Sequence, residues 1–128
     1  MNNEGGSKVF EEETISGIAT APGEGGIGII RMSGTLAIDI IDRVFQGIKG
    51  KKAADIESQH VAYGHIVDPE SKKRVDEVLV LIMRAPRSYT REDVVEIHCH
   101  GGAVPLKRIL ELTEFKPNIE MIQQSHLL

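Results

Sequence analysis

Short apolar stretches separated by polar turns predict a chain built mainly of β-strands. Residues 15–19 and 27–32 are rich in β-branched side chains and are too short for helices, so both are predicted to be strands. Longer strand-like runs lie at 59–67 and 75–83. The polar segment between them, 68–74, begins with Asp-Pro, which is typical of a turn, and the two runs are therefore predicted to form a hairpin.

Two segments show the spacing of amphipathic helices. Residues 34–45 place apolar side chains at intervals close to i, i+4 and leave the charged ones for water. Ser33 or Thr35 is expected to cap this helix. Residues 101–112 are predicted to form a second helix with Pro105 in its first turn, where a backbone N–H is not needed.

A further strand at 94–100 completes the predicted order β-β-α-β-β-β-α. This order indicates an α+β fold, a single domain with a mostly antiparallel sheet flanked by two helices. The run 75–83 is apolar on both faces after Val78, so we expect it inside the sheet. The lysine-rich segment 47–55 is expected to be an exposed loop.

The pattern is weaker at both ends of the chain. Residues 1–13 contain a run of three glutamates and few apolar side chains, and they are predicted to be a mobile acidic lead-in. The predicted folded domain covers 14–112. Residues 113–128 are predicted to be a separate tail, in which a short amphipathic helix is possible after Pro117.

Composition narrows the class of protein. With 128 residues and 14.1 kDa, the chain is expected to form one domain. A net charge of −4 argues against a general nucleic-acid binder, which usually carries a basic excess. A single cysteine, Cys99, excludes an intrachain disulfide and fits a reducing compartment. No apolar run approaches the roughly 18 residues of a membrane span, so we expect a cytoplasmic protein without membrane contact.

The glycines at positions 23, 25 and 28 match GxGxxG, the pattern of dinucleotide-binding loops. That function requires a helix to follow the glycines, so that the helix N-terminus meets the pyrophosphate. Here the glycines lead into the predicted strand 27–32. A tight turn with close backbone approach is favoured, or a bare backbone that packs against a ligand or partner. No GxxxxGK[ST] sequence is present, so this chain is not expected to hydrolyse nucleotides.

The sequence His98-Cys99-His100 resembles a set of metal ligands. In a strand, however, His98 and His100 lie on one face and Cys99 on the other, so the three cannot bind one ion together. A fourth ligand with suitable spacing is also missing. We therefore predict no metal site, and histidines that pack or hydrogen-bond within the sheet. The same geometry leaves Cys99 without an adjacent base, and no catalytic residue is predicted.

Arg31 and Glu96 are charged residues inside apolar strands. Glu96 shares a face with Val94 and His98, and Arg31 follows two isoleucines. A carboxylate in such a place costs free energy unless it is paired. One interpretation is an ion pair, or the solvent side of an antiparallel sheet. The other is two ligand contacts of opposite charge, because a carboxylate accepts paired hydrogen bonds and an arginine binds carbonyl or carboxylate oxygens.

Three segments carry a resemblance to a known family. They read ATAPGEGGIGIIRMSG, YGHIVDP and DEVLVLIMRAPRSYTREDVVEIHCHGG. Together they resemble the N-terminal domain of the tRNA-modifying GTPases of the MnmE (TrmE) family, and the resemblance runs from about Thr14 to Leu112. The stretch APRSYTREDVVEIHCHGG is its most specific part.

The resemblance implies a fold similar to the tetrahydrofolate-binding domain of the glycine-cleavage aminomethyltransferase. It implies a domain that binds a reduced folate, 5-formyltetrahydrofolate, and that forms a homodimer. Full-length members add a helical domain and a potassium-activated GTPase domain, which binds GTP. With a flavin-containing partner, MnmG (GidA), they modify the wobble uridine of certain tRNAs at carbon 5, and the folate supplies the one-carbon unit.

Two site residues follow from the family motifs. The folate-contacting arginine of GIGIIR corresponds to Arg31, and the folate-contacting glutamate of VVEIHCHGG corresponds to Glu96. The family continues with a segment that holds a further basic folate contact, whereas residues 113–128 do not match it and Lys116 lies in a different context. We therefore expect a truncated or separately expressed part of a longer protein, which is not catalytic alone.

Other functions stay open from the sequence. The chain could be a dimerisation or interaction module that no longer binds folate. It could bind RNA through a loop that holds Arg84, Arg87, Arg91 and Tyr89, although the acidic balance of the chain speaks against this. An autonomous folate-dependent methyltransferase needs a second substrate site, for which the chain is too short.

Overall fold

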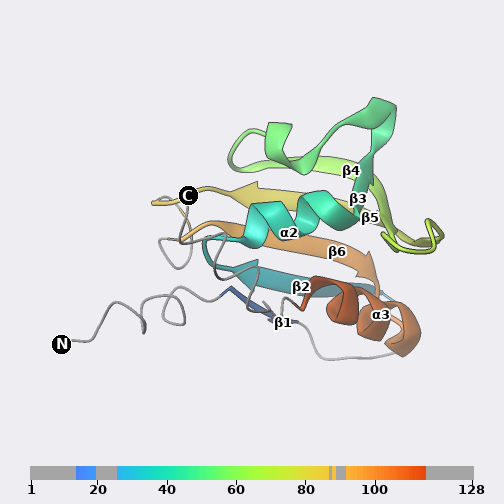
Figure 1. The fold of residues 1–128 in the computed structure, drawn as a ribbon. Coiled ribbons are helices and arrows are strands. Elements are labelled where there is room, and N and C mark those ends of the chain that lie inside the picture. Colours follow the sequence, from blue (N-terminus) through green and yellow to red (C-terminus); the bar gives the residue numbers. More distant parts are fainter. Residues whose placement is uncertain (1–13, 20–25, 87, 89–91, 115–128) are drawn as a thin grey trace, which may run out of the picture.

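The computed structural model describes residues 14–19, 26–86, 88 and 92–114 (Figure 1). The predicted lead-in at 1–13 and most of the predicted tail, from residue 115 on, lie outside the described residues. The elements are β1 (Ile15–Ile18), β2 (Ile27–Ser33), α2 (Ala37–Val44), β3 (Phe45–Gly47), β4 (His60–Val67), β5 (Arg74–Met83), β6 (Val94–His100) and α3 (Ala103–Thr113), with two single-turn 3₁₀ helices, η1 (Ile48–Gly50) and η2 (Ala53–Asp55).

All six strands pair antiparallel in one sheet, in the order β1-β2-β6-β5-β4-β3. The α+β fold class and the hairpin of β4 and β5 are therefore confirmed. Strand β5 lies between β6 and β4, as its apolar faces predicted. Asp68 begins the hairpin turn, where its carboxylate accepts hydrogen bonds from the backbone N–H groups of Glu70 and Ser71.

The two helices α2 and α3 cover the same face of the sheet (Figure 1). Side chains on this face are excluded from water because successive residues of a strand point to opposite faces and alternate ones meet the helices. Across the three central strands, Ile30, Ile97 and Val80 stand side by side in register. The fully buried side chains are Ile30, Met32, Ile41, Ile66, Val80, Ile82, Val94, Val95, Ile97, Leu106, Ile109 and Thr113.

Helix α2 begins later than the sequence predicted. Its N-cap residue is Leu36, not Ser33 or Thr35. The Leu36 backbone N–H donates instead to Oγ1 of Thr14, 2.9 Å away, from the residue before β1. Gly34 lies against Thr14, where a Cβ would come within 2.6 Å of the Thr14 Cα. The cap is therefore supplied by a segment distant in sequence.

The segment predicted as an exposed loop at 47–55 is more ordered than expected. It follows β3, contains η1 and η2, and buries Ala53. Strand β3 can pair with β4 because residue 64 is glycine: a Cβ there would lie 2.3 Å from the carbonyl oxygen of Gln46. This contact between backbones extends the sheet by one strand that the hydrophobic pattern did not indicate.

Candidate ligand site on the open face of the sheet

The face of the sheet opposite α2 and α3 combines charged and apolar side chains. We call it the open face, and the side chains of interest there are Ile15, Ile27, Ile29, Arg31, Val61, Tyr63, Leu79, Leu81, Glu96 and His98. Several of its large apolar side chains are exposed, Ile27 among them at 67% of its surface. Contiguous exposed apolar surface often marks a ligand or partner site.

Arg31 and Glu96 form an ion pair on this face. They lie directly opposite each other in the register of β2 and β6. Both Nε and Nη2 of Arg31 donate to the same oxygen of Glu96, Oε2, over 2.9 and 2.7 Å. Glu96 is only 5% exposed, whereas the Arg31 side chain is 41% exposed. The structure therefore shows the ion pair that one interpretation of the sequence expected, on the open face of the sheet.

His98 contacts the other oxygen of the same carboxylate. Its Nε2 lies 3.1 Å from Oε1 of Glu96, because residues two apart on a strand share a face. Apolar side chains flank this cluster: Leu81 is opposite Glu96, and His98 lies between Leu79 and Ile29 on the neighbouring strands. Both Glu96 oxygens therefore have a partner.

Glu96 stays ionised despite its burial. Loss of water around the carboxyl acts to raise its pKa. Hydrogen bonds from His98 and Arg31, together with the positive charge of Arg31, act in the opposite direction and outweigh the burial. The pKa of Glu96 is lowered from its ordinary value, so the group is an anionic acceptor at neutral pH.

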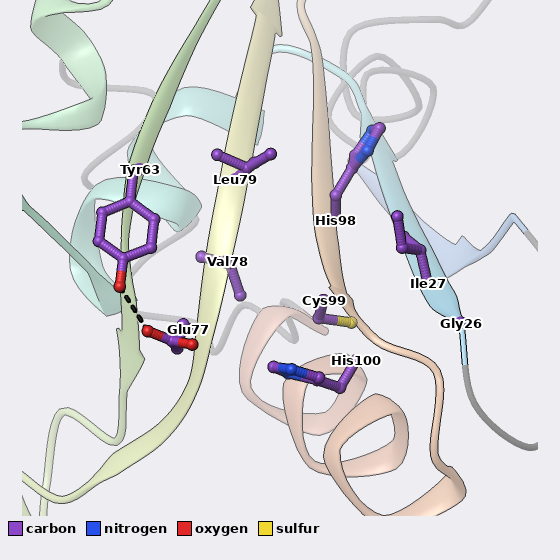
Figure 2. A pocket seen from close by; sticks show the side chains of 9 residues that line it. All are labelled: Gly26, Ile27, Tyr63, Glu77, Val78, Leu79, His98, Cys99 and His100. Carbon is purple, nitrogen blue, oxygen red and sulfur yellow. Dashed lines mark hydrogen bonds between the residues drawn. The ribbon is translucent and has the colours of Figure 1, made fainter.

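A hollow of about 220 Å³ lies beside this cluster (Figure 2). His98 stands on its wall between Leu79 and Ile27, which come from the strands on either side (Figure 2). At the far side, the Tyr63 hydroxyl donates to the Glu77 carboxylate, the hydrogen bond drawn in Figure 2. The lining residues are Gly26, Ile27, Tyr63, Glu77, Val78, Leu79, His98, Cys99 and His100.

Cys99 is separated from its two histidine neighbours, as predicted. It is buried, and its thiol lies 3.5 Å from the carbonyl oxygen of Gly28. Burial, together with the negative charge of Asp76, raises its pKa to about 11, so the thiolate is scarce at neutral pH. His100 instead binds Asp76, with 2.6 Å between Nδ1 and Oδ1. Among the described residues, no three His, Cys, Asp or Glu side chains are grouped to hold a metal ion.

The glycine motif is described only in its second half. Gly23 and Gly25 lie outside the described residues. After Gly26, which has a φ of +69°, the chain enters β2 and not a helix, as the sequence predicted. A Cβ at Gly28 would come within 2.6 Å of the Leu106 side chain in α3. Close packing of backbone on the helix therefore accounts for this glycine.

The comparison with known proteins gives the family. Residues 14–123 match the family described as GTP-binding protein TrmE N-terminus. The chain belongs to this family. The matched range includes Arg31, Glu96 and the strands that carry them, β2 and β6.

Two curated relatives of this TrmE N-terminal domain share more than half of the aligned residues. The tRNA modification GTPase MnmE of Alkaliphilus metalliredigens is 59% identical over 104 residues, which cover 81% of this chain and 23% of that protein. The tRNA modification GTPase MnmE of Geobacillus kaustophilus is 52% identical over 102 residues, 80% of this chain and 22% of that protein. The chain thus spans less than a quarter of the length of these relatives.

Sequence reasoning placed His98 on the same face as Glu96 and predicted that the histidines pack or hydrogen-bond, but it did not predict the hydrogen bond between His98 and Glu96. The signal was present in the spacing Glu-x-His on one strand, which places both side chains on one face. The arginine-rich loop is described in part: Nη2 of Arg84 donates to the carbonyl oxygens of Ala54 and Ile56, and Arg87, Tyr89 and Arg91 lie outside the described residues. Neither helix in the described ranges is long and apolar enough to cross a membrane.

Proposed function

We propose that the chain is the reduced-folate-binding domain of a tRNA-modifying GTPase, and that Arg31 and Glu96 bind 5-formyltetrahydrofolate. Membership of the TrmE N-terminal family supports this proposal, as do relatives that carry the name tRNA modification GTPase. The observation that carries it is the ionised, nearly buried Glu96 carboxylate on the open face, held by Arg31 in the register of two central strands.

The chemistry of these residues fits a folate. The pterin ring presents a ring N–H and an exocyclic NH₂ side by side, and a carboxylate with two oxygens is the acceptor that suits such a donor pair. Arg31 is partly exposed and suits the acceptor oxygens of the ligand. The exposed Leu79 and Ile27 offer apolar surface for the flat face of a ring. When bound, the folate supplies a one-carbon unit.

The rest of the activity belongs to the longer protein in this proposal. The one-carbon unit is used at carbon 5 of a tRNA wobble uridine, together with a flavin-containing partner of the MnmG type. GTP and potassium act in a separate domain. The present chain contributes the folate site and a homodimer contact, and it acts in the cytoplasm.

Isothermal titration of 5-formyltetrahydrofolate into the 128-residue chain tests the folate site. We expect saturable binding that Glu96→Ala abolishes. Glu111→Ala is the matched control, because Glu111 is an exposed glutamate on α3 that pairs with Arg108 over 3.4 Å. Binding that is absent from the folded wild-type chain, or that survives Glu96→Ala unchanged, would contradict the proposal.

A second function, a dimerisation module that does not bind folate, is favoured by the exposed apolar side chains of the open face. Ile15, Ile27, Val61 and Leu79 are all largely exposed there. Sedimentation of the chain over a range of concentrations tests the dimer, and the titration of 5-formyltetrahydrofolate separates the two functions. For this module we expect a dimer that Ile27→Asp dissociates and that folate does not affect. Val104→Asp is the control, because Val104 is 81% exposed on α3.

A further inference from the structure

We propose that His98 competes with the ligand of Glu96 for one oxygen of the carboxylate. His98 holds Oε1 of Glu96 over 3.1 Å, and when a ligand with paired N–H donors binds, the imidazole leaves this oxygen and turns into the adjacent hollow. His98 thereby sets the affinity of the site and favours ligands that replace its hydrogen bond. The inference rests on the proposed function, since it concerns the same carboxylate.

The geometry of the two Glu96 oxygens carries this inference. A ligand with two adjacent N–H groups needs both oxygens of the carboxylate along one edge. Oε2 already accepts two hydrogen bonds from Arg31, over 2.9 and 2.7 Å, in a charge-assisted pair. Oε1 accepts a single, longer one from His98, over 3.1 Å. The single contact to His98 is therefore the one that costs least to break, and a ligand N–H on Oε2 also has to replace one of the two Arg31 hydrogen bonds.

The displaced imidazole has a place to go. His98 lines the hollow of about 220 Å³, and its neighbours on both sides are apolar, Leu79 from β5 and Ile27 from β2 (Figure 2). The backbone of β6 does not need to change, because a rotation of the His98 side chain alone breaks the contact with Oε1.

Titration of 5-formyltetrahydrofolate into three variants tests the proposal. His98→Ala removes the competing donor, and we expect it to bind the folate roughly three- to tenfold more tightly than the wild type. His98→Gln keeps an amide N–H that can donate to Oε1, and we expect an affinity near that of the wild type. His60→Ala is the control, because His60 is an exposed histidine that pairs with Glu57 over 3.5 Å.

The ¹⁵N resonances of the histidine side chains give a second readout, which a merely structural role of His98 does not predict. On saturation with the folate, the Nε2 signal of His98 should move as its bond to Glu96 is lost, while the signals of His60 stay in place. Circular dichroism confirms that each variant is folded.

The outcomes distinguish a failure of the inference about His98 from a failure of the proposed folate binding. Equal folate affinity of the wild type and His98→Ala, or weaker binding by His98→Ala, would overturn the role of His98 and leave the folate site standing. Binding by His98→Ala alone would contradict the proposed function of the wild-type chain, while still showing that His98 competes for the carboxylate. If neither chain binds, the proposed function fails, and the inference about His98 fails with it.

Discussion

The two faces of strand β6 carry different kinds of side chain, apolar ones toward the helices and mainly polar ones on the open face. Val95, Ile97 and Cys99 point toward the helices and are buried among apolar side chains. Glu96 and His98 alternate with them and point to the open face, where they pair with each other and with Arg31. A single strand therefore contributes to the core on one side and to the candidate site on the other.

The difference is clearest for the two ionisable groups Cys99 and Glu96. Both are nearly excluded from water, at 4% and 5% exposure. Burial keeps the Cys99 thiol protonated and raises its pKa to about 11. Glu96 keeps its charge because both oxygens accept hydrogen bonds, and its pKa is lowered. Partners, more than burial alone, decide which buried group stays ready to bind a ligand.

Truncation of a core side chain should give the largest difference between the faces. Ile97 is fully buried at the centre of the sheet, so Ile97→Ala should lower the free energy of unfolding by about 2–5 kcal/mol. The same change at the exposed Ile27 should cost less than about 0.5 kcal/mol. Urea unfolding followed by circular dichroism measures both. Similar losses for the two variants would mean that the open face is also packed as a core.

Addition of a methyl group sharpens the same comparison at two glycines. A Cβ at Gly28 would come within 2.6 Å of Leu106, so Gly28→Ala should destabilise the chain by about 1–3 kcal/mol. Gly17 lies opposite Arg31, and a Cβ there meets nothing within 4 Å, so Gly17→Ala should be nearly neutral. Thermal unfolding measures both variants.

A third variant identifies the cause of the loss at Gly28. In a Leu106→Ala background the clash is relieved, and Gly28→Ala should cost much less than it does in the wild type. A cost that is unchanged in that background would indicate that backbone conformation, and not the contact with α3, requires the glycine.

Much of the sheet could be predicted because its signals are local. Short runs rich in β-branched residues indicate β2 and β6, and the Asp-Pro turn indicates the hairpin of β4 and β5. The pairing of Arg31 with Glu96 was one of two interpretations that the sequence left open, since each is a charge inside an apolar strand. The register that places them opposite each other shows the ion pair, and their contacts with a ligand stay a prediction.

The remaining features depend on contacts between distant segments. Strand β3 exists because Gly64 allows the backbone of Gln46 to approach, and a pattern of hydrophobic residues does not report such an approach. Helix α2 begins at Ala37 because Thr14 bonds to the residue before it. The contact of His98 with Glu96 depends on side-chain rotamers, so the spacing of the two residues permits it without requiring it.

Acid should reduce the contribution of Glu96, on the open face, to the free energy of unfolding. The folded pKa of Glu96 is lowered, so its contribution to stability is complete above its ordinary value of 4.5 and is lost as the pH falls through the folded value. At pH 7, Glu96→Gln should lower the free energy of unfolding by about 1 kcal/mol, a modest amount because Arg31 is partly exposed. Below pH 4.5 the difference between the two chains should shrink toward zero.

Urea titrations of the wild type and Glu96→Gln between pH 3 and pH 7 measure this difference, and contributions of the other carboxylates cancel between the chains. Glu111→Gln is the control, since its exposed contact with Arg108 should contribute less than about 0.5 kcal/mol at any pH. A difference for Glu96→Gln that stays constant down to pH 3 would mean that the side chain stabilises the sheet by its shape. The open face would then lack the charge on which both its ion pair and its proposed ligand depend.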